Sequence, residues 1–249
     1  MVMKQLEGKT AIVTGGAQGF GRAISLRLAK EGAFVCLFDI KSCDETVSLI
    51  EKNGGSVKAY SVNVANVNEI NNAISQIIKE RGVEILVNNS GVVTTHENLT
   101  TVSDEIWDKE IAVNLTGAFH CSRAVLEHMI QKQYGKIVNI SSVAGATGRY
   151  MTSPAYAAAK AGIHGLTMST AKSVAKHGIN VNTIAPGPIV TGIHASYPQE
   201  TIDKILNEIP YKRKGKPEDI ANTVLFLVSD DSEFITGERI HVNGGAWMG

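Results

Sequence analysis

The sequence has little of what marks secreted, membrane or nucleic-acid-binding proteins. It contains 3 cysteines, Cys36, Cys43 and Cys121, whose spacing matches neither a zinc site nor a disulfide framework. Its 24 basic and 24 acidic side chains give a formal net charge of +0, whereas a nucleic-acid binder needs a basic face. No uncharged apolar run approaches the roughly 18 residues of a membrane-spanning helix, and residues 1–10 lack the apolar centre of a secretory signal. We therefore expect a cytoplasmic protein with buried or inert thiols, no nucleic-acid partner and no membrane partner.

Linkers and metal motifs are scarce as well. All 6 prolines fall at or after Pro154, and no segment rich in Pro, Gly or Ser divides the 249 residues. The 7 histidines are scattered, and His96-Glu97 lacks a second histidine four positions on, so no metal site is predicted. With 43% hydrophobic residues the chain can bury one large core. One domain over residues 1–249 is predicted.

Short β-branched runs alternate with longer amphipathic stretches along the whole chain. The runs are continuously apolar, which is typical of strands buried on both faces of a parallel sheet. They lie at Thr10–Thr14, Phe34–Phe38, Val57–Val62, Ile85–Asn88, Lys136–Ile140, Asn180–Ile184 and Arg239–Val242. Helices are predicted at Phe20–Lys30, Asp44–Asn53, Val67–Arg81, Ser103–Gln131, Ser153–His177 and Pro217–Ser229. This alternation predicts an α/β fold with a doubly wound parallel sheet and helices on both faces.

The alternation breaks between Pro188 and Gly215, where a polar segment surrounds a short predicted helix, Gln199–Glu208. Long excursions in compact domains often form lids or binding loops. We expect a substrate-binding lobe at about residues 188–215, with a plain surface helix as the alternative.

A glycine-rich turn follows the first predicted strand and opens a helix, in the segment Thr14-Gly15-Gly16-Ala17-Gln18-Gly19-Phe20-Gly21. Glycines allow a tight turn and let the backbone N–H groups at a helix start approach a pyrophosphate. Asp39 ends the second strand, where a carboxylate can accept hydrogen bonds from a ribose diol. An ordinary strand-to-helix turn, and an aspartate that caps the next helix, are the alternatives.

Tyr156 and Lys160 lie four residues apart in a helical stretch and therefore share a helix face. A buried ammonium beside a phenol stabilises the phenolate and lowers the pKa of the phenol from about 10. Ser142 follows the strand Lys136–Ile140, at the carboxyl edge where α/β sheets bind ligands. The alternatives are a surface Tyr–Lys pair and a serine that makes a local loop bond.

Taken together, these motifs resemble the short-chain dehydrogenase/reductase family over essentially the whole chain and in the order typical of the family. The resemblance rests on the Thr14–Gly21 turn, Asn88-Asn89-Ser90-Gly91, Asn114, Ser142, Tyr156 with Lys160, and Pro186-Gly187 with Thr191. The segments Gly215–Ile220 and Asn243–Gly249 are similar to those of its 3-oxoacyl-thioester reductases and small alcohol dehydrogenases.

The resemblance implies a Rossmann-type sheet of about seven strands in the order 3-2-1-4-5-6-7, and a catalytic tetrad. Tyr156 would be the general acid/base, Lys160 would lower its pKa and hold the nicotinamide ribose, and Ser142 would orient the substrate oxygen. Asn114, which is polar within an apolar helical segment, would hold a water that links Lys160 to solvent; a purely structural hydrogen bond is the alternative.

Further residues are implied for the cofactor and the substrate. Besides Tyr156 and Lys160, the cofactor set is Gly15, Gln18, Gly19, Phe20, Gly21, Asp39, Ile40, Asn63, Val64, Asn89, Ser90, Gly91, Pro186, Gly187, Ile189 and Thr191. Besides Ser142 and Tyr156, the substrate set is Ala144, Arg149, Tyr150 and Gly187. The family pattern has Ala where this chain has Ser90, and an acidic residue where it has Asn63, whose side-chain carbonyl is expected to accept the hydrogen bond of the adenine amino group instead.

Asp39 predicts NAD as the cofactor, because a carboxylate repels the 2′-phosphate of NADP; Lys41 is the one nearby cation and leaves room for moderate NADP tolerance. We expect an NAD-dependent oxidoreductase acting on a secondary alcohol or ketone. A 3-oxoacyl-thioester reductase and a non-catalytic dinucleotide-binding module are the alternatives. The helix that carries Tyr156 is small and apolar almost all round, which predicts that a second copy of the chain covers it, in a homotetramer.

Overall fold

Seven parallel strands form one sheet in the computed structural model, which describes residues 4–95, 98–148, 152–189, 200, 207 and 209–249. The strand order is β3-β2-β1-β4-β5-β6-β7, so the doubly wound α/β fold and the order expected from the family resemblance are confirmed. The strands are β1 (Thr10–Thr14), β2 (Phe34–Asp39), β3 (Ser56–Ser61), β4 (Ile85–Asn88), β5 (Gly135–Ile140), β6 (Ile179–Pro186) and β7 (Arg239–Val242).

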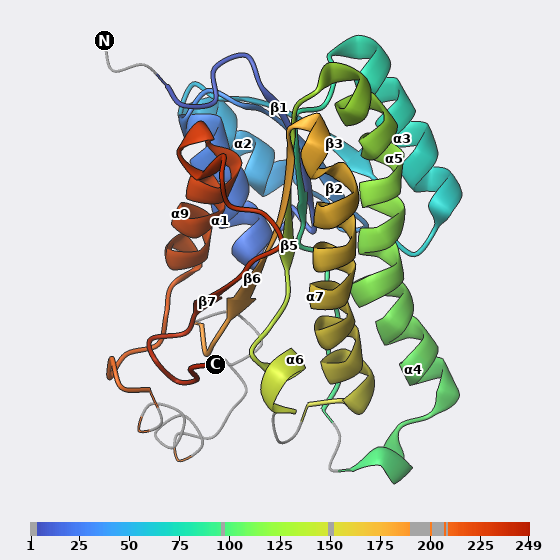
Figure 1. Cartoon of the computed structure of the whole chain (residues 1–249), viewed down its shortest axis with the longest axis vertical. Coiled ribbons are helices and arrows are strands. Elements are labelled where there is room, and N and C mark those ends of the chain that lie inside the picture. Colours follow the sequence, from blue (N-terminus) through green and yellow to red (C-terminus); the bar gives the residue numbers. More distant parts are fainter. Residues whose placement is uncertain (1–3, 96–97, 149–151, 190–199, 201–206, 208) are drawn as a thin grey trace.

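Helices cover both faces of the sheet, as Figure 1 shows, with α1, α2 and α9 on one side and α3, α4, α5 and α7 on the other. The helices are α1 (Gly19–Lys30), α2 (Asp44–Lys52), α3 (Val67–Glu80), α4 (Asp104–Ile111), α5 (Gly117–Lys132), α6 (Ala144–Thr147), α7 (Pro154–Val174) and α9 (Pro217–Val228). Single turns occur at η1 (Leu99–Thr101), η2 (Ala112–Thr116), η3 (Ala175–His177) and η5 (Asp230–Ser232).

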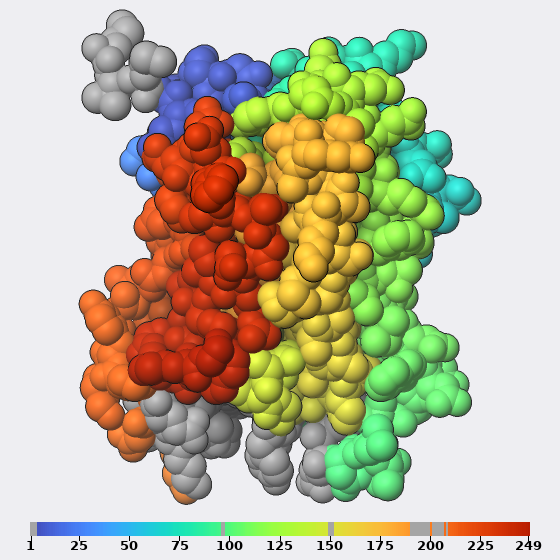
Figure 2. Space-filling view, viewed as in Figure 1, coloured from blue at the N-terminus to red at the C-terminus, as the bar shows by residue number. Residues whose placement is uncertain are grey.

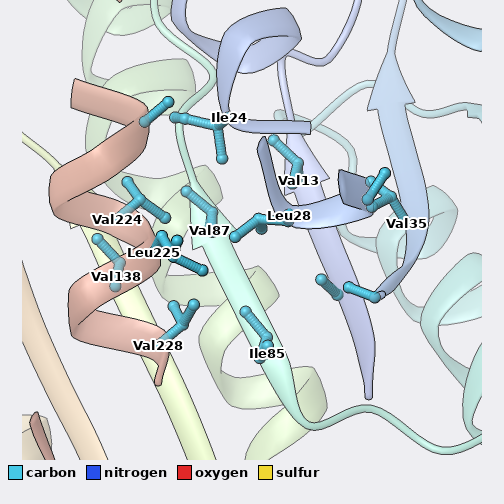
Figure 3. Packing of buried hydrophobic residues seen from close by; sticks show 14 of the residues in the cluster. Val13, Ile24, Leu28, Val35, Ile85, Val87, Val138, Val224, Leu225 and Val228 are labelled. Atoms are coloured by element: carbon cyan, nitrogen blue, oxygen red, sulfur yellow. The ribbon is translucent and has the colours of Figure 1, made fainter. Parts of the chain in front are cut away.

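Two apolar cores lie between these layers. In the first, Ile24 and Leu28 of α1 and Val224 of α9 pack on Val13 and Val87 of the central strands (Figure 3), and all five side chains are 0% exposed. The second core lies on the opposite face of the sheet, under α3, α5 and α7. The two cores together bury both faces of the central strands, and the loops that follow these strands carry the candidate site.

The central strands β1, β4, β5 and β6 are buried along their whole length, as their continuous apolar runs predicted. The prediction was wrong for β3, whose residues are half-buried or exposed, and for β7, which is half-buried throughout. Both strands lie at the edges of the sheet, where neighbours cover less of each strand.

The single helix predicted at Ser103–Gln131 is interrupted. Between α4 and α5 the chain makes a π-helical turn at Ala112–Thr116, with one extra residue in the turn. The short helix α6 was not predicted. The helix predicted at Gln199–Glu208, and most of the lobe expected at residues 188–215, lie outside the described residues.

All three cysteines are buried and unpaired. Burial raises the pKa of the Cys36 and Cys121 thiols to about 12 and that of Cys43 to about 11, which makes them poor nucleophiles. Within the described ranges, no helix has the length and apolar character needed to cross a bilayer. Nor do any three His, Cys, Asp or Glu side chains of these ranges gather where a metal ion could bind.

Candidate active site

The loops at the carboxyl ends of the strands bring most of the predicted residues to one edge of the sheet. Because all the strands are parallel, the loops after β1, β2, β4, β5 and β6 open on the same side. The lower part of Figure 1 shows this edge, with α6 and the first turn of α7 beside it.

The glycine turn is packed too tightly for larger residues. Gly15 has a φ of +69° and Gly19 a φ of +56°, which favour glycine. A Cβ atom at Gly21 would collide with the carbonyl oxygen of Gly15 and lie 2.8 Å from Nδ2 of Asn89. Asn89 Nδ2 itself donates to the Thr14 carbonyl oxygen at 2.8 Å, so β1, the glycine turn and the loop after β4 are hydrogen-bonded together.

The N-terminus of α1 is left open by its own sequence. Its N-cap residue, Gln18, makes no side-chain capping bond, and the first turn contains no acidic residue. By contrast, Asn66 caps α3 and Ser153 caps α7 through their side chains. Free N–H groups and the positive end of the helix dipole suit a phosphate, so the turn fits the pyrophosphate of a dinucleotide.

We expect Gly21→Ala to lower the free energy of unfolding by about 1–3 kcal/mol, because the added methyl group meets a backbone carbonyl that cannot move without opening the turn. Gly16→Ala is the matched control, since a Cβ there would mainly meet the flexible Leu37 side chain, at 2.9 Å. Urea unfolding of the two variants checks this. Equal losses for both would contradict the tight packing at Gly21.

Asp39 lies where the sequence predicted it, at the end of β2. Its Oδ2 accepts a hydrogen bond from Ala17 N at 3.0 Å and its Oδ1 accepts one from Lys41 N at 2.9 Å. The carboxylate is therefore fixed against the glycine turn, with lone pairs left for a ribose diol. It does not cap α2, whose N-cap residue is Cys43.

A second cation, Arg22, contacts the same residue of the glycine turn as Asp39, Ala17, and the sequence analysis missed it. Its guanidinium donates to the Ala17 carbonyl oxygen at 2.7 Å and makes a two-pronged ion pair with Glu45 at 2.6 and 2.7 Å. The expectation that Lys41 is the one nearby cation was therefore wrong. The charge of Arg22 is already balanced by Glu45, and a basic residue directly after the last glycine was the signal available in the sequence.

Further residues of the cofactor set differ in how the structure places them. Asn63 Oδ1 accepts a hydrogen bond from Ala65 N at 3.0 Å. The oxygen that was expected to accept from the adenine amino group therefore already has one partner in its own loop. Gly187 packs against the backbone of Asn243 too closely for a side chain: a Cβ atom added at Gly187 would lie only 2.7 Å from the Cα of Asn243. Ile189 is 2% exposed and packs in the core. Val64 is also buried, whereas Ile40 is 71% exposed.

Lys160 is 4% exposed and projects from α7 toward the end of β5. Its Nζ donates to the Ile140 carbonyl oxygen at 2.8 Å and lies 5.6 Å from the centre of the Tyr156 ring. Burial lowers the pKa of Lys160 from its usual 10.5 to about 8, so the group is still mostly protonated at neutral pH. The alternative of a surface pair does not fit the structure, because Lys160 is buried and Tyr156 is half-buried.

Ser142 and Ala144 follow β5 and face the start of α7. The Ser142 Oγ accepts a hydrogen bond from Ala144 N at 3.1 Å, which uses a lone pair and leaves the hydroxyl proton available. Tyr156 is half-buried, while Ala144 is buried. Two predicted substrate residues, Arg149 and Tyr150, and one predicted cofactor residue, Thr191, lie outside the described residues.

Asn114 is 2% exposed and sits in the π-helical turn. Its Nδ2 donates to the carbonyl oxygens of Val92 at 2.8 Å and Glu110 at 2.9 Å, and its Oδ1 accepts from Val92 N at 3.1 Å. A Cβ at Gly91 would lie 2.9 Å from Asn114 Oδ1 and 3.6 Å from Lys160 Nζ. Asn114 Oδ1 and Lys160 Nζ therefore both lie close to Gly91.

Comparisons with known proteins agree with this arrangement. A family model described as Enoyl-(Acyl carrier protein) reductase matches residues 15–246. The chain is 40% identical to a 3-oxoacyl-(acyl-carrier-protein) reductase of Staphylococcus epidermidis, covering 96% of this chain and 99% of the relative. It is 39% identical to the protein of the same name from Thermotoga maritima, covering 97% of this chain and 98% of the relative.

Two solved structures are similar to the whole chain. One is a protein of Agrobacterium tumefaciens provisionally described as a 2-deoxy-d-gluconate 3-dehydrogenase, with NADP bound; its TM-score is 0.91 at 35% identity, with 99% of both chains covered. The other, from Sinorhizobium meliloti, is provisionally described as a short-chain alcohol dehydrogenase; its TM-score is 0.93 at 34% identity, with 98% of both chains covered. The identities, the family match over residues 15–246 and the sheet order agree, and the chain therefore belongs to the short-chain dehydrogenase/reductase family of oxidoreductases.

Proposed function

We propose that this oxidoreductase transfers a hydride between NAD and a secondary alcohol or ketone, with Tyr156 as the general acid/base. The observation that carries the proposal is the buried Lys160 ammonium beside the Tyr156 ring, at the carboxyl edge of the sheet. The nicotinamide ring, when bound, gives or takes the hydride at the substrate carbon. The protein has to move the matching proton at the substrate oxygen.

In ketone reduction, Tyr156 would donate its phenolic proton to the carbonyl oxygen, and in alcohol oxidation it would take that proton back. The positive charge of Lys160 stabilises the phenolate left on Tyr156. The Ser142 hydroxyl, whose oxygen already accepts from Ala144 N, would donate its proton to the same substrate oxygen and so orient it. Lys160 would also hold the nicotinamide ribose.

Asn114 would serve the proton path rather than the substrate. Its Oδ1 accepts one hydrogen bond, from Val92 N, and keeps a second lone pair for a water molecule next to Lys160. Such a water would link Lys160 to solvent. The alternative of a purely structural role is supported by the same three bonds to Val92 and Glu110, so Asn114→Ala kinetics must separate the two roles.

We propose NAD as the preferred cofactor, although a solved relative binds NADP. The Asp39 carboxylate would accept hydrogen bonds from the ribose diol and repel a 2′-phosphate, and the Arg22 charge that would counter this repulsion is paired with Glu45. We expect Asp39→Ala to shift the ratio of kcat/KM for NAD over NADP toward NADP by about tenfold, equivalent to roughly 1.4 kcal/mol. A parent enzyme that prefers NADP, or a ratio that does not move, would contradict the role of Asp39.

Reduction of a 3-oxoacyl thioester is the second candidate function. It is favoured by the relatives at 39–40% identity, which carry the name of 3-oxoacyl-(acyl-carrier-protein) reductase. A panel of secondary alcohols, diols and 3-oxoacyl thioesters, followed by the absorbance of the reduced nicotinamide with each cofactor, tests both functions. If only the 3-oxoacyl thioesters react, the panel supports the thioester reductase. If no substrate is turned over, the panel supports a non-catalytic dinucleotide-binding module instead.

We also propose a homotetramer assembled through α7. Along this helix, Ala158, Ala161 and Gly165 are exposed and Met168 is 45% exposed, and Figure 2 shows α7 along the visible face of the molecule. Phe119 of neighbouring α5 is 40% exposed. Small apolar residues on an exposed helix allow close approach of an identical helix across a two-fold axis.

Light scattering at micromolar concentration is expected to give the mass of a tetramer. Gly165→Glu should reduce that mass, because a side chain there meets no atom of its own chain within 4 Å but blocks a partner helix. Ser173→Glu, at an exposed position near the end of α7, is the control and should leave the mass unchanged. A monomer mass for the parent protein would contradict the proposed homotetramer.

The cytoplasmic location remains a prediction from the sequence.

A further inference from the structure

One buried acidic side chain next to the site has no role in the reaction described above. Glu110, the seventh residue of α4, is 1% exposed. Its Oε1 accepts two hydrogen bonds from Thr94, one from the backbone N at 2.7 Å and one from the hydroxyl at 2.8 Å. Its Oε2 is buried and has no hydrogen-bond partner.

Stability alone does not explain a glutamate at this position. A buried carboxylate oxygen without a partner destabilises the fold, and an apolar side chain of similar size would avoid that cost. Buried polar groups are nearly always satisfied, so an exception next to a candidate active site points to a task for the residue. The two bonds of Oε1 indicate that the task is to hold Thr94.

Thr94 ends a short segment, Val92–Thr94, that contacts both helices of the tetrad. At one end, Val92 makes two hydrogen bonds with the Asn114 side chain. At the other end, the Thr94 carbonyl oxygen accepts from Ser153 N at 3.1 Å. Ser153 is the N-cap of α7: its Oγ accepts from Ala155 N and its carbonyl oxygen accepts from Ala157 N.

Tyr156 lies in the first turn of α7, between Ala155 and Ala157, whose N–H groups donate to Ser153. Asn114 is tied to Glu110 directly as well, because its Nδ2 donates to the Glu110 carbonyl oxygen at 2.9 Å. Glu110 is thus bonded through its backbone to the residue next to Lys160, and through its side chain to the segment that fixes the start of the Tyr156 helix.

We propose that Glu110 is a positioning residue for the hydride-transfer reaction: its carboxylate holds the Val92–Thr94 segment so that the first turn of α7 presents Tyr156 to the substrate oxygen. The inference rests on the proposed role of Tyr156. The positioning depends on the reach of the side chain, that is, on its being long enough to bring an acceptor oxygen to Thr94, and not on its charge. Both bonds to Thr94 are made by Oε1, and Oε2 has no partner.

Two conservative variants separate reach from charge. Glu110→Gln keeps the length and an acceptor oxygen but loses the charge, whereas Glu110→Asp keeps the charge but is one methylene too short to reach Thr94. We expect kcat to stay within about threefold of the parent for Gln and to fall at least about tenfold for Asp, because small misplacements of reacting groups are costly. The dissociation constant of NAD, measured by protein fluorescence, should change by less than about twofold in both, since the effect lies in kcat.

Hydrogen exchange gives a readout that does not depend on turnover. The amides of Ala155 and Ala157 should exchange faster in Glu110→Asp and at the parent rate in Glu110→Gln. Asp108→Asn, at an exposed position of the same helix, is the control and should change neither kcat nor exchange. If the parent turns over no substrate, the proposed function fails, while the exchange arm still tests whether Glu110 fixes the helix start.

Parent-like kcat and parent-like exchange in a folded Glu110→Asp variant would overturn the inference. So would a Gln variant as slow as the Asp variant, because the charge would then be what counts. If Glu110→Asp does not fold, Glu110→Gln still decides, since a loss of more than about tenfold in kcat with native circular dichroism contradicts the claim that reach is sufficient.

Discussion

Tyr156→Phe is expected to lower kcat by at least about a hundredfold, while the fold and the dissociation constant of NAD stay unchanged. The substitution removes one hydroxyl group and no bulk, so the packing of the first turn of α7 is retained. General acid/base catalysis typically contributes about 10²–10⁴-fold to the rate, so loss of the proton donor should cost at least the lower of these factors. Steady-state kinetics and NAD titration check both halves of this prediction.

Tyr134→Phe is the matched control for this experiment. Tyr134 is half-buried like Tyr156 and directly precedes β5, at the sheet edge opposite the candidate site. Its hydroxyl donates to Asp230, and its variant should retain the parent kcat. If Tyr156→Phe also retained full turnover with NAD bound, another group would have to carry the proton.

Lys160→Met is expected to reduce the rate and yet to stabilise the protein at neutral pH. The rate should fall by at least about a hundredfold, since the charge that stabilises the phenolate is lost. Burial lowers the pKa of Lys160 to about 8 in the folded chain, whereas in the unfolded chain it is near 10.4. The folded state therefore carries an unfavourable charge at any pH below about 8, and methionine removes it.

The size and sign of the stability effect follow from the two pKa values. A difference of about 2.5 units corresponds to roughly 3 kcal/mol, and loss of the hydrogen bond to the Ile140 carbonyl oxygen offsets about 1 kcal/mol of it. At pH 7 the variant should be more stable by about 2 kcal/mol on this arithmetic. Between about pH 8 and pH 10.4 the folded parent sheds its proton before the unfolded chain does, so the parent gains stability with rising pH and the advantage of the variant disappears.

Urea unfolding of parent and variant at pH 7 and pH 10 measures this difference directly. Other titrating groups, including the buried Lys136, are present in both proteins and cancel in the comparison. A variant that is less stable than the parent at pH 7 would show that the Lys160 ammonium is not held under a desolvation penalty.

The sequence predicted the parallel sheet and the position of most site residues, because both depend on local signals. Continuous apolar runs mark β1, β4, β5 and β6. Asp39 is the last residue of β2, and Ser142 lies two residues after the end of β5. The π-helical turn around Asn114 could not be predicted, because Ile111–Leu115 has the same apolar pattern in either kind of helix. Its effect is to place Asn114 against Val92.

Contacts between residues far apart in the sequence could not be predicted either. Arg22 meets Glu45 across 23 positions, and Glu110 meets Thr94 across 16. Taken singly, Arg22, Glu45 and Glu110 look like ordinary helix residues. A signal was nevertheless present for Glu110, since an acidic residue four positions before Asn114 falls on the same buried helix face.

The central claim is that the chain moves a hydride between a nicotinamide and a carbonyl carbon while Tyr156 supplies the proton. Its most direct test is to offer the parent protein reduced NAD and reduced NADP, each carrying deuterium at the transferable position, together with a panel of ketones that includes a 3-oxoacyl thioester. The account predicts an alcohol product with one deuterium at the former carbonyl carbon, formed faster from reduced NAD and at least about a hundredfold more slowly by Tyr156→Phe. Deuterium transfer that persists at the parent rate in Tyr156→Phe, or no transfer to any ketone from either cofactor, would contradict it.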